Sequence, residues 1–97
     1  MSVILINPFE VPKGKEDEAL AYWEKCADLM RTSPGFISTK LHKAITPDAR
    51  FKFINVAEWE SAKHFQDVVA SPEFQEVSAP GVEPYPHYPA LFEVVRT

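Results

Sequence analysis

The chain has 97 residues, 45% of them hydrophobic and 12% aromatic, which suits one compact domain covering residues 1–97. Its formal net charge is −4, and its Lys and Arg residues are scattered, so it has no basic stripe for binding DNA or RNA. The single cysteine, Cys26, excludes an intrachain disulfide, and the apolar start stops at Asn7-Pro8, far short of a membrane span. With no basic leader in view, we expect a cytoplasmic protein.

The first half of the sequence predicts a strand, a helix and a further strand. Residues 3–11 are rich in β-branched and aromatic side chains that alternate between two faces, as in a β-strand. Apolar residues then recur at helical spacing from Ala19 to Met30, which predicts a helix ending before Ser33-Pro34-Gly35. Residues 36–44 predict the second strand.

The second half predicts a strand, a broken helix and a closing strand. A third strand is expected from about residue 50 to residue 59, in a hairpin with the second, and Ser61 can cap the following helix. Ser71-Pro72 predicts a break in that helix. Residues 79–89 hold four prolines and one glycine, so we expect an ordered loop carrying Tyr85, His87 and Tyr88 back across the molecule, before a last strand over residues 91–96.

The order βαββαβ is that of an α+β, ferredoxin-like fold with a four-stranded antiparallel sheet. In this fold the helices cover only one face of the sheet, yet both faces of the predicted strands are apolar. Ile4 and Ile6 of the first strand and Ile54 and Val56 of the third lie on the face that the helices leave open. We therefore predict a homodimer that packs sheet against sheet, a dimeric α+β barrel.

The polar candidates for a site lie on the opposite, helix-covered face. Counting by twos along the third strand places Asn55 and Trp59 there, and Asn7 and Phe9 of the first strand share that layer. Two carboxamides and an indole are unfavourable in an apolar layer unless they are paired. They either bond to backbone groups or line a cavity that receives a polar ligand.

Motifs for other chemistries are absent from the sequence. The three histidines lie in different predicted elements, and no spacing of His, Cys, Asp or Glu predicts a metal site. No glycine-rich phosphate loop or nucleophile elbow is present, which argues against flavin and nicotinamide cofactors bound by familiar motifs. The lone Cys26 has no catalytic partner in the sequence and is predicted to pack in the core.

Four segments resemble the antibiotic-biosynthesis-monooxygenase family: residues 6–11 (INPFEV), 34–36 (PGF), 55–61 (NVAEWES) and 71–74 (SPEF). The resemblance spans nearly the whole chain. One branch of that family consists of cofactor-independent oxygenases that oxidise polycyclic phenols, with an Asn-x-x-x-Trp motif at the end of the third strand. Asn55 and Trp59 match this spacing, whereas the tyrosine of that branch falls at Phe65.

A second branch degrades haem with an asparagine, a tryptophan and a histidine. Asn7 matches the asparagine, but the tryptophan and the histidine fall at about Val68 and Ser78, so haem cleavage is not expected.

The resemblance to the first branch implies a monooxygenase that uses O2 without metal or flavin on a small aromatic or quinol-type metabolite. Asn55 and Trp59 would be its catalytic residues. An ionised phenol can reduce oxygen directly, so the protein need only desolvate the phenol and stabilise the developing oxyanions. The expected substrate-binding residues are Asn7, Phe9, Trp23, Phe53 and Phe65, with His42 and His64 as candidates for a base.

Two alternatives remain at this point. The chain could be a non-catalytic, small-ligand-binding or stress-related dimer of the same fold, or a purely structural relative with a closed core. An enclosed apolar cavity with convergent polar groups would favour the first two of these three hypotheses.

Overall fold

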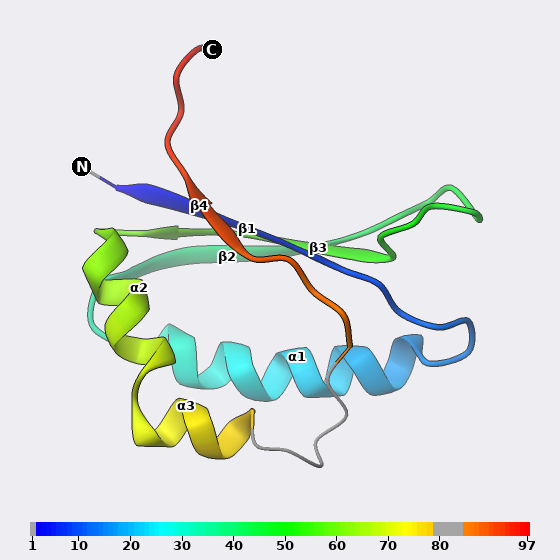
Figure 1. Cartoon of the computed structure of the whole chain (residues 1–97), viewed down its shortest axis with the longest axis horizontal. Helices are drawn as coiled ribbons and strands as arrows, with labels where there is room; N and C mark the ends of the chain where they lie inside the picture. Colours follow the sequence, from blue (N-terminus) through cyan, green and yellow to red (C-terminus); the bar gives the residue numbers. More distant parts are fainter. Residues whose placement is uncertain (1, 79–84) are drawn as a thin grey trace.

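A computed structural model describes residues 2–78 and 85–97 and shows an antiparallel sheet lying on a layer of helices (Figure 1). The elements follow the expected order, with the second helical region divided into two helices. Their bounds are β1 Val3–Phe9, α1 Glu16–Arg31, β2 Phe36–Lys43, β3 Phe53–Trp59, α2 Ala62–Val69, α3 Pro72–Val77 and β4 Ala90–Phe92. The predicted α+β, ferredoxin-like fold is confirmed.

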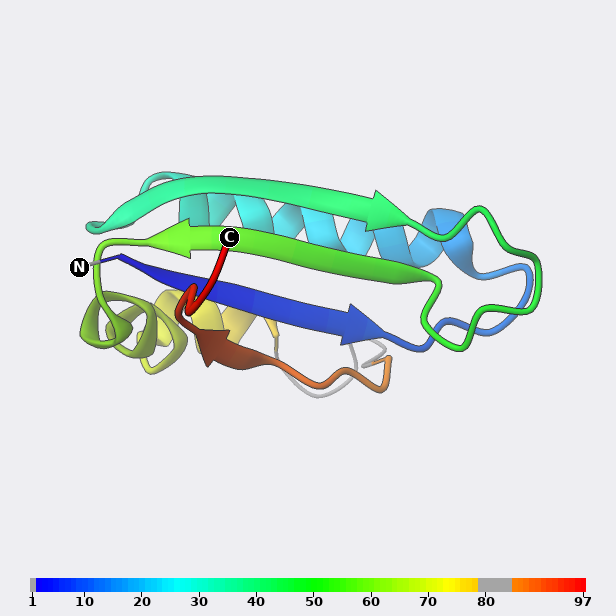
Figure 2. The ribbon, with the colours of Figure 1, turned by 90° about the horizontal axis from the view of Figure 1, so that it is seen from above.

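The four strands lie side by side in the order β2-β3-β1-β4, and all neighbours are antiparallel (Figure 2). In β3, Phe53, Asn55, Ala57 and Trp59 are buried, while the residues between them are half-buried. This alternation follows from the period of two in a strand and confirms which face of β3 the helices cover. The register pairs Asn7 of β1 directly with Asn55 of β3.

The helices begin where the sequence supplies caps. The hydroxyl of Ser61 accepts a hydrogen bond from the backbone N–H of His64 at the start of α2, and that of Ser71 accepts one from Phe74 at the start of α3. Pro72 occupies the first turn of α3, where a missing N–H is tolerated. The expected break between two helices is therefore confirmed.

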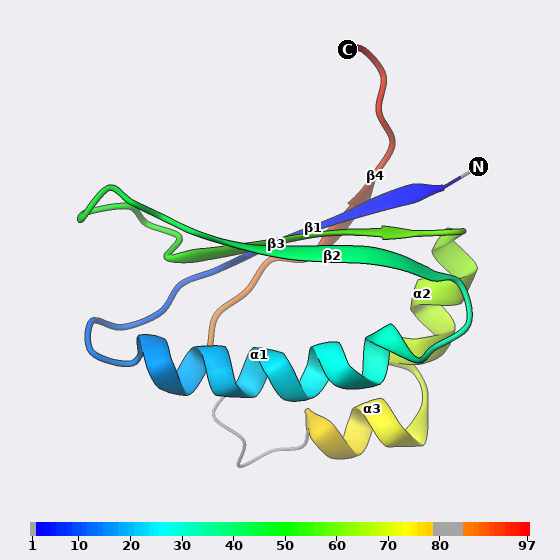
Figure 3. The same cartoon turned by 180° about the vertical axis from the view of Figure 1, so that it is seen from behind.

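The turn that leads into β2 passes very close to α2, as the view from behind shows (Figure 3). Gly35 has φ +86°, and a Cβ atom at this position would lie within 2.5 Å of side-chain atoms of His64. Only glycine combines this backbone conformation with so close an approach. Gly35 thus fixes the distance between the β2 end of the sheet and the N-terminus of α2.

Several strand limits differ from those expected. The first strand ends at Phe9 rather than residue 11, and the third begins at Phe53 rather than residue 50. The last strand covers 90–92 rather than 91–96, because Phe92 already pairs with Ile4 and β1 begins at Val3. The residues after Glu93 therefore have almost no strand left to pair with. They form a tail that leaves the body of the molecule (Figure 1). Within the expected loop, residues 79–84 lie outside the described part of the chain.

The face of the sheet opposite the helices has no covering layer within the described chain (Figures 1 and 3). Ile4, Ile6, Ile54 and Val56 are half-buried on it, and Phe92 is 47% exposed. Val94 and Val95 in the tail are 68% and 82% exposed. Apolar side chains thus form part of the surface on this side.

Candidate functional site

A cavity of about 220 Å³ lies between the sheet and the helices. Most of the side chains around it are aliphatic or aromatic, and a few are polar. The residues that line it include Asn7, Phe9, Tyr22, Trp23, Cys26, Thr39, Asn55, Trp59, Phe65 and His87. A concave, mostly apolar space with a few convergent polar groups is typical of a small-molecule site.

The two carboxamides at the cavity differ in their hydrogen bonds. The hydroxyl of Thr39 donates to Oδ1 of Asn55 over 2.6 Å, which satisfies the carbonyl oxygen of a residue that is only 8% exposed. Oδ1 of Asn7, directly across from it in β1, is buried and has no hydrogen-bond partner among the described residues. Asn55 is therefore held by the fold through its carbonyl, while Asn7 keeps an unused acceptor.

Trp59 contributes an unused donor. Its side chain is 1% exposed, and its Nε1 has no hydrogen-bond partner in the described part of the chain. Phe36 and Phe65 pack edge-on against the indole, with ring centroids 5.4 Å and 5.6 Å away. Such aromatic pairs stabilise by roughly 0.5–1.5 kcal/mol each beyond their buried area and hold the ring in one orientation.

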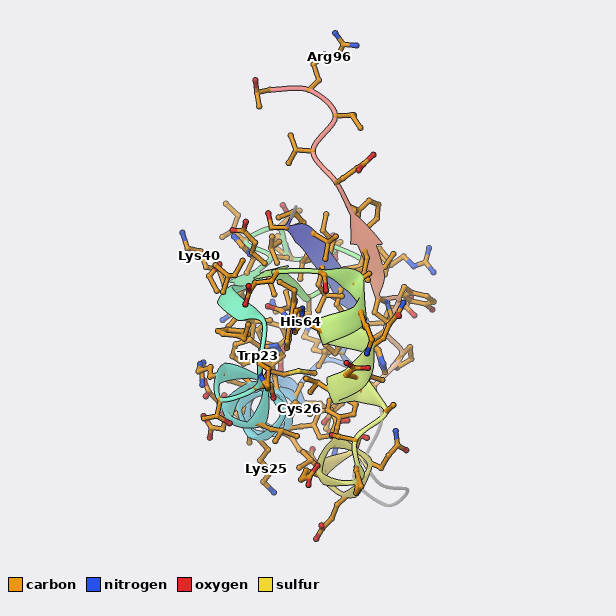
Figure 4. The ribbon with its side chains drawn as sticks, turned by 90° about the vertical axis from the view of Figure 1, so that its left-hand side faces the viewer. Trp23, Lys25, Cys26, Lys40, His64 and Arg96 are labelled. Atoms are coloured by element: carbon orange, nitrogen blue, oxygen red, sulfur yellow. The ribbon has the colours of Figure 1, made fainter. Side chains whose placement is uncertain are left out.

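Most of the predicted site residues come together at this cavity. Six of the nine line it: Asn7, Phe9, Trp23, Asn55, Trp59 and Phe65. Figure 4 shows Trp23 between α1 and the sheet. Phe53 lines a smaller neighbouring void of about 10 Å³, together with Phe9 and Trp23.

The structure does not bring His42 or His64 to the cavity. His42 is exposed on the edge strand β2, and the pairing His42–Ile54 puts it on the face that the helices leave open. His64 lies at the start of α2, where its Nδ1 is 2.7 Å from the Ser61 hydroxyl and its ring packs against Gly35. Neither histidine is therefore placed to act on a ligand in the cavity.

The histidine that does line the cavity is His87. It forms an isolated antiparallel bridge with Phe9, and the two rings stack with centroids 5.5 Å apart. The sequence alone indicated that residues 79–89 return across the molecule, but a proline-rich segment has no periodicity from which to predict a face. The pairing with β1 supplies that information, because it continues the register of β4 past Ala90.

Two further titratable groups line the cavity from α1. Burial raises the pKa of Tyr22 to about 12, and it also raises the pKa of the Cys26 thiol. Both groups are therefore neutral near pH 7, and Cys26 is not an activated nucleophile. Cys26 lies on the side of α1 toward the cavity (Figure 4), so the expectation of a packing role is compatible with its position.

The tryptophan and the histidine of the haem-degrading branch have no counterpart at Val68 and Ser78. The cavity of about 220 Å³ is smaller than the ~300 Å³ at which sites for drug-sized ligands begin, and a porphyrin is a large ligand on that scale. Val68 is buried in the core, and the Ser78 hydroxyl is bonded to the Phe74 carbonyl. No three His, Cys, Asp or Glu side chains of the described residues gather closely enough to hold a metal ion.

Among the described residues no helix is long and apolar enough to span a bilayer.

The comparisons with known proteins agree with this architecture. The family model described as antibiotic biosynthesis monooxygenase matches residues 2–80, so the chain belongs to that family. No curated protein matches the sequence.

Solved structures resemble the whole chain. A Shewanella loihica protein, provisionally described as a monooxygenase, is 38% identical with a TM-score of 0.86, and the match covers 99% of this chain and 96% of that one. SnoaB, a cofactor-independent oxygenase from Streptomyces nogalater, is 23% identical with a TM-score of 0.82, covering 99% and 95%. The heme-degrading protein Rv3592 from Mycobacterium tuberculosis is 28% identical with a TM-score of 0.69, covering 100% and 98%. These likenesses extend over the full fold.

Proposed function

We propose that this protein is a cofactor-independent monooxygenase that acts on a small, hydroxylated aromatic compound. The observation that carries the proposal is the pair of unused polar groups, Asn7 Oδ1 and Trp59 Nε1, buried beside an apolar cavity. A buried polar group without a partner costs about 1–3 kcal/mol. A ligand that supplies both partners recovers this free energy on binding.

The hydrogen-bonding groups define the complementary ligand. Asn7 Oδ1 accepts hydrogen bonds, so it would bind a hydroxyl group of the ligand. Trp59 Nε1 donates a hydrogen bond, so it would bind an oxygen atom of the ligand. The amide NH2 of Asn55 is a second donor, because its hydrogen bond with Thr39 uses only the carbonyl oxygen. An apolar cavity of ~150 Å³ can hold one benzene ring. The volume of about 220 Å³ therefore favours a ligand of one or two rings.

The chemistry follows from an electron-rich ring held away from water. The ionised ring transfers one electron to O2, and the two radicals combine to form a carbon–oxygen bond. The resulting peroxide anion takes up the proton that the substrate hydroxyl released, and the hydroperoxide then loses water. One oxygen atom stays in the quinone product and the other leaves as water. Donors from Asn55 and Trp59 would stabilise negative charge on the reacting oxygens, which in a water-excluded site is an effective use of a hydrogen bond.

One observation favours a second candidate, a dimer that binds a small ligand without oxidising it. Phe65 lines the cavity where the oxygenase branch resembled by the sequence has a tyrosine, so a phenolic donor is missing there. Such a binding protein would use the same cavity and the same two unused groups. A purely structural function is disfavoured, because a closed core would have neither the cavity nor the unpaired groups.

The decisive experiment is oxygen uptake with catechols and naphthoquinols, and with the larger anthrones for comparison, with metals chelated and no flavin added. Wild type, Asn55→Ala, Trp59→Phe and the control His42→Gln are compared, since His42 lies outside the cavity. We expect uptake above background in wild type and His42→Gln and a loss of about a hundredfold in the two cavity variants. No uptake by the wild type, together with thermal stabilisation by these compounds, would instead establish the binding protein.

The proposed functional unit is a homodimer in which two sheets pack through their open faces. The half-buried Ile4, Ile6, Ile54 and Val56 supply an apolar patch there, and burial of apolar surface favours association by about 25 cal/mol per Å². The C-terminal tail leaves the body on the same side (Figure 1), where a partner could cover Val94 and Val95. A closed pair with two-fold symmetry would bury both patches at once.

A further inference from the structure

We infer that His87 is the general base of the proposed reaction and that the substrate is an aromatic diol. This inference rests on the proposed function and adds to it the group that removes the proton. The titratable side chains that line the cavity, among the described residues, are Tyr22, Cys26 and His87.

Only one of these three side chains suits a base near neutral pH. Burial raises the pKa of Tyr22 to about 12 and also raises the pKa of Cys26, so both hold their protons. Imidazole is the side chain whose ordinary pKa lies closest to neutrality, and general bases work best near the operating pH. Glu10, the residue after Phe9, is paired with Arg50 over 2.8 Å.

A hydrogen bond between the His87 ring and the backbone sets the tautomer of that ring. Its Nδ1 lies 2.9 Å from the backbone carbonyl oxygen of Tyr85. A carbonyl oxygen can only accept, so Nδ1 carries the proton and donates it. In the neutral ring Nε2 is then unprotonated and can take a proton. Stacking on Phe9 further restricts the ring.

The backbone on both sides of His87 is fixed to β1 and the loop after it. The N–H of Tyr88 donates to the Pro8 carbonyl over 3.1 Å, and the N–H of Glu10 donates to the Pro86 carbonyl over 2.8 Å. The phenol of Tyr88 also donates to Glu10 Oε2 over 3.0 Å. A base held in this way needs little rearrangement before it reacts.

The position of His87 relative to Asn7 identifies the substrate class. His87 pairs with Phe9, so it is the diagonal cross-strand neighbour of Asn7 on the face that lines the cavity. Diagonal neighbours lie about 7–8 Å apart, within the joint reach of such side chains. Both Asn7 Oδ1 and His87 Nε2 accept hydrogen bonds, so an aromatic ring that carries two hydroxyl groups can donate to both.

In the proton transfer the two hydroxyl groups of the diol behave differently. One hydroxyl remains protonated and donates to Asn7 Oδ1. The second loses its proton to His87 Nε2, and the electron pair of the broken O–H bond stays on the ring oxygen. No electron leaves the ring in this step, and O2 is the oxidant in the next. Because His87 is exposed at the edge of the cavity, its imidazolium can return the proton to solvent.

The test separates proton transfer from oxidation. Under anaerobic conditions the ultraviolet band of the phenolate reports whether a bound naphthalene diol with adjacent hydroxyls has ionised. We expect wild type and the control His42→Gln to bind the monoanion at neutral pH. With His87→Gln we expect the neutral diol at this pH, and in air an oxygen uptake about a hundredfold slower. Added imidazole should restore part of the uptake in His87→Ala.

Each outcome bears on one of the two proposals. An unchanged phenolate band in His87→Gln would overturn the inference, even if the wild type consumes oxygen. Ionisation that depends on His87, without oxygen uptake by the wild type, would support His87 as the base and reject the monooxygenase. If the variants fail to fold, nitrogen NMR of the wild type still decides, because diol binding must convert the His87 ring to imidazolium. A ring that stays neutral on binding contradicts the inference.

Discussion

Asn7 and Asn55 stand directly opposite each other in β1 and β3, yet only the carbonyl oxygen of Asn55 has a hydrogen-bond partner among the described residues. One layer of the sheet thus combines a carbonyl oxygen held by the fold with a buried carbonyl oxygen that has no partner among the described residues. The difference arises in β2, which supplies the Thr39 hydroxyl to its neighbour β3 and cannot reach past it to β1.

Replacing Asn7 by leucine should stabilise the free protein while abolishing ligand binding. The substitution removes a buried acceptor that has no partner, so we expect the free energy of unfolding to rise by about 1 kcal/mol. Urea denaturation measures this change, and a thermal shift with the diol measures binding. Asn7→Asp is the matched control, since it keeps the shape but adds a buried charge and should destabilise. A clear loss of stability in Asn7→Leu would mean that the fold itself needs this amide.

Replacing Thr39 by valine should have the opposite effect on stability. Valine keeps the shape but removes the hydroxyl, which leaves Asn55 Oδ1 without its 2.6 Å hydrogen bond in a buried position. We expect the free energy of unfolding to fall by about 1–3 kcal/mol. Thr39→Ser keeps the hydroxyl and should retain most of the stability. If serine and valine prove equally destabilising in urea, the methyl group rather than the hydroxyl is what matters at this position.

Stability should fall in acid through Glu10. Hydrogen bonds from Arg50 and then Tyr88 lower the pKa of Glu10 below its ordinary value of 4.5. A carboxylate with a lowered pKa in the folded state stabilises the fold at pH values above about 4.5, and this contribution is lost as the pH falls through the folded value.

The acid dependence can be measured as melting temperature between neutral and acidic pH. Arg50→Met should flatten the dependence below about pH 4.5, because it removes the largest cause of the shift. Lys63→Met is a suitable control, since Lys63 makes an exposed ion pair with Asp67 on a different element. The assignment to Glu10 is rejected if both variants keep the slope of the wild type.

A charge on the open face of the sheet should disrupt the proposed dimer. Ile6 pairs with Val56 on the open face of the sheet, so Ile6→Asp would place a carboxylate in the proposed interface. We expect wild type to sediment at twice the 11.0 kDa of one chain and Ile6→Asp to sediment as a monomer. Ile45→Asp is the control, because Ile45 is already 97% exposed in the loop between β2 and β3. A monomeric wild type would contradict the dimer directly.

The local sequence determined a large part of the fold. Alternation along residues 53–59 identified the helix-covered face of β3, and the hydroxyls of Ser61 and Ser71 marked where α2 and α3 begin. These features could be predicted because strand alternation and helix capping depend on neighbours only a few residues away. Asn7, Asn55 and Trp59 could be predicted as candidate site residues for the same reason, since they are polar groups on an otherwise apolar face.

The tertiary structure alone decided which histidine meets the cavity. His42 and His64 were candidates by residue type, but strand pairing puts one on the open face and the approach of Gly35 confines the other. His87 lines the cavity because a bridge to Phe9, distant in the sequence, fixes its face. Whether Asn7 Oδ1 has a hydrogen-bond partner likewise depends on which strand lies beside β1. Such pairings join residues far apart in the chain, and no local pattern of residues encodes them.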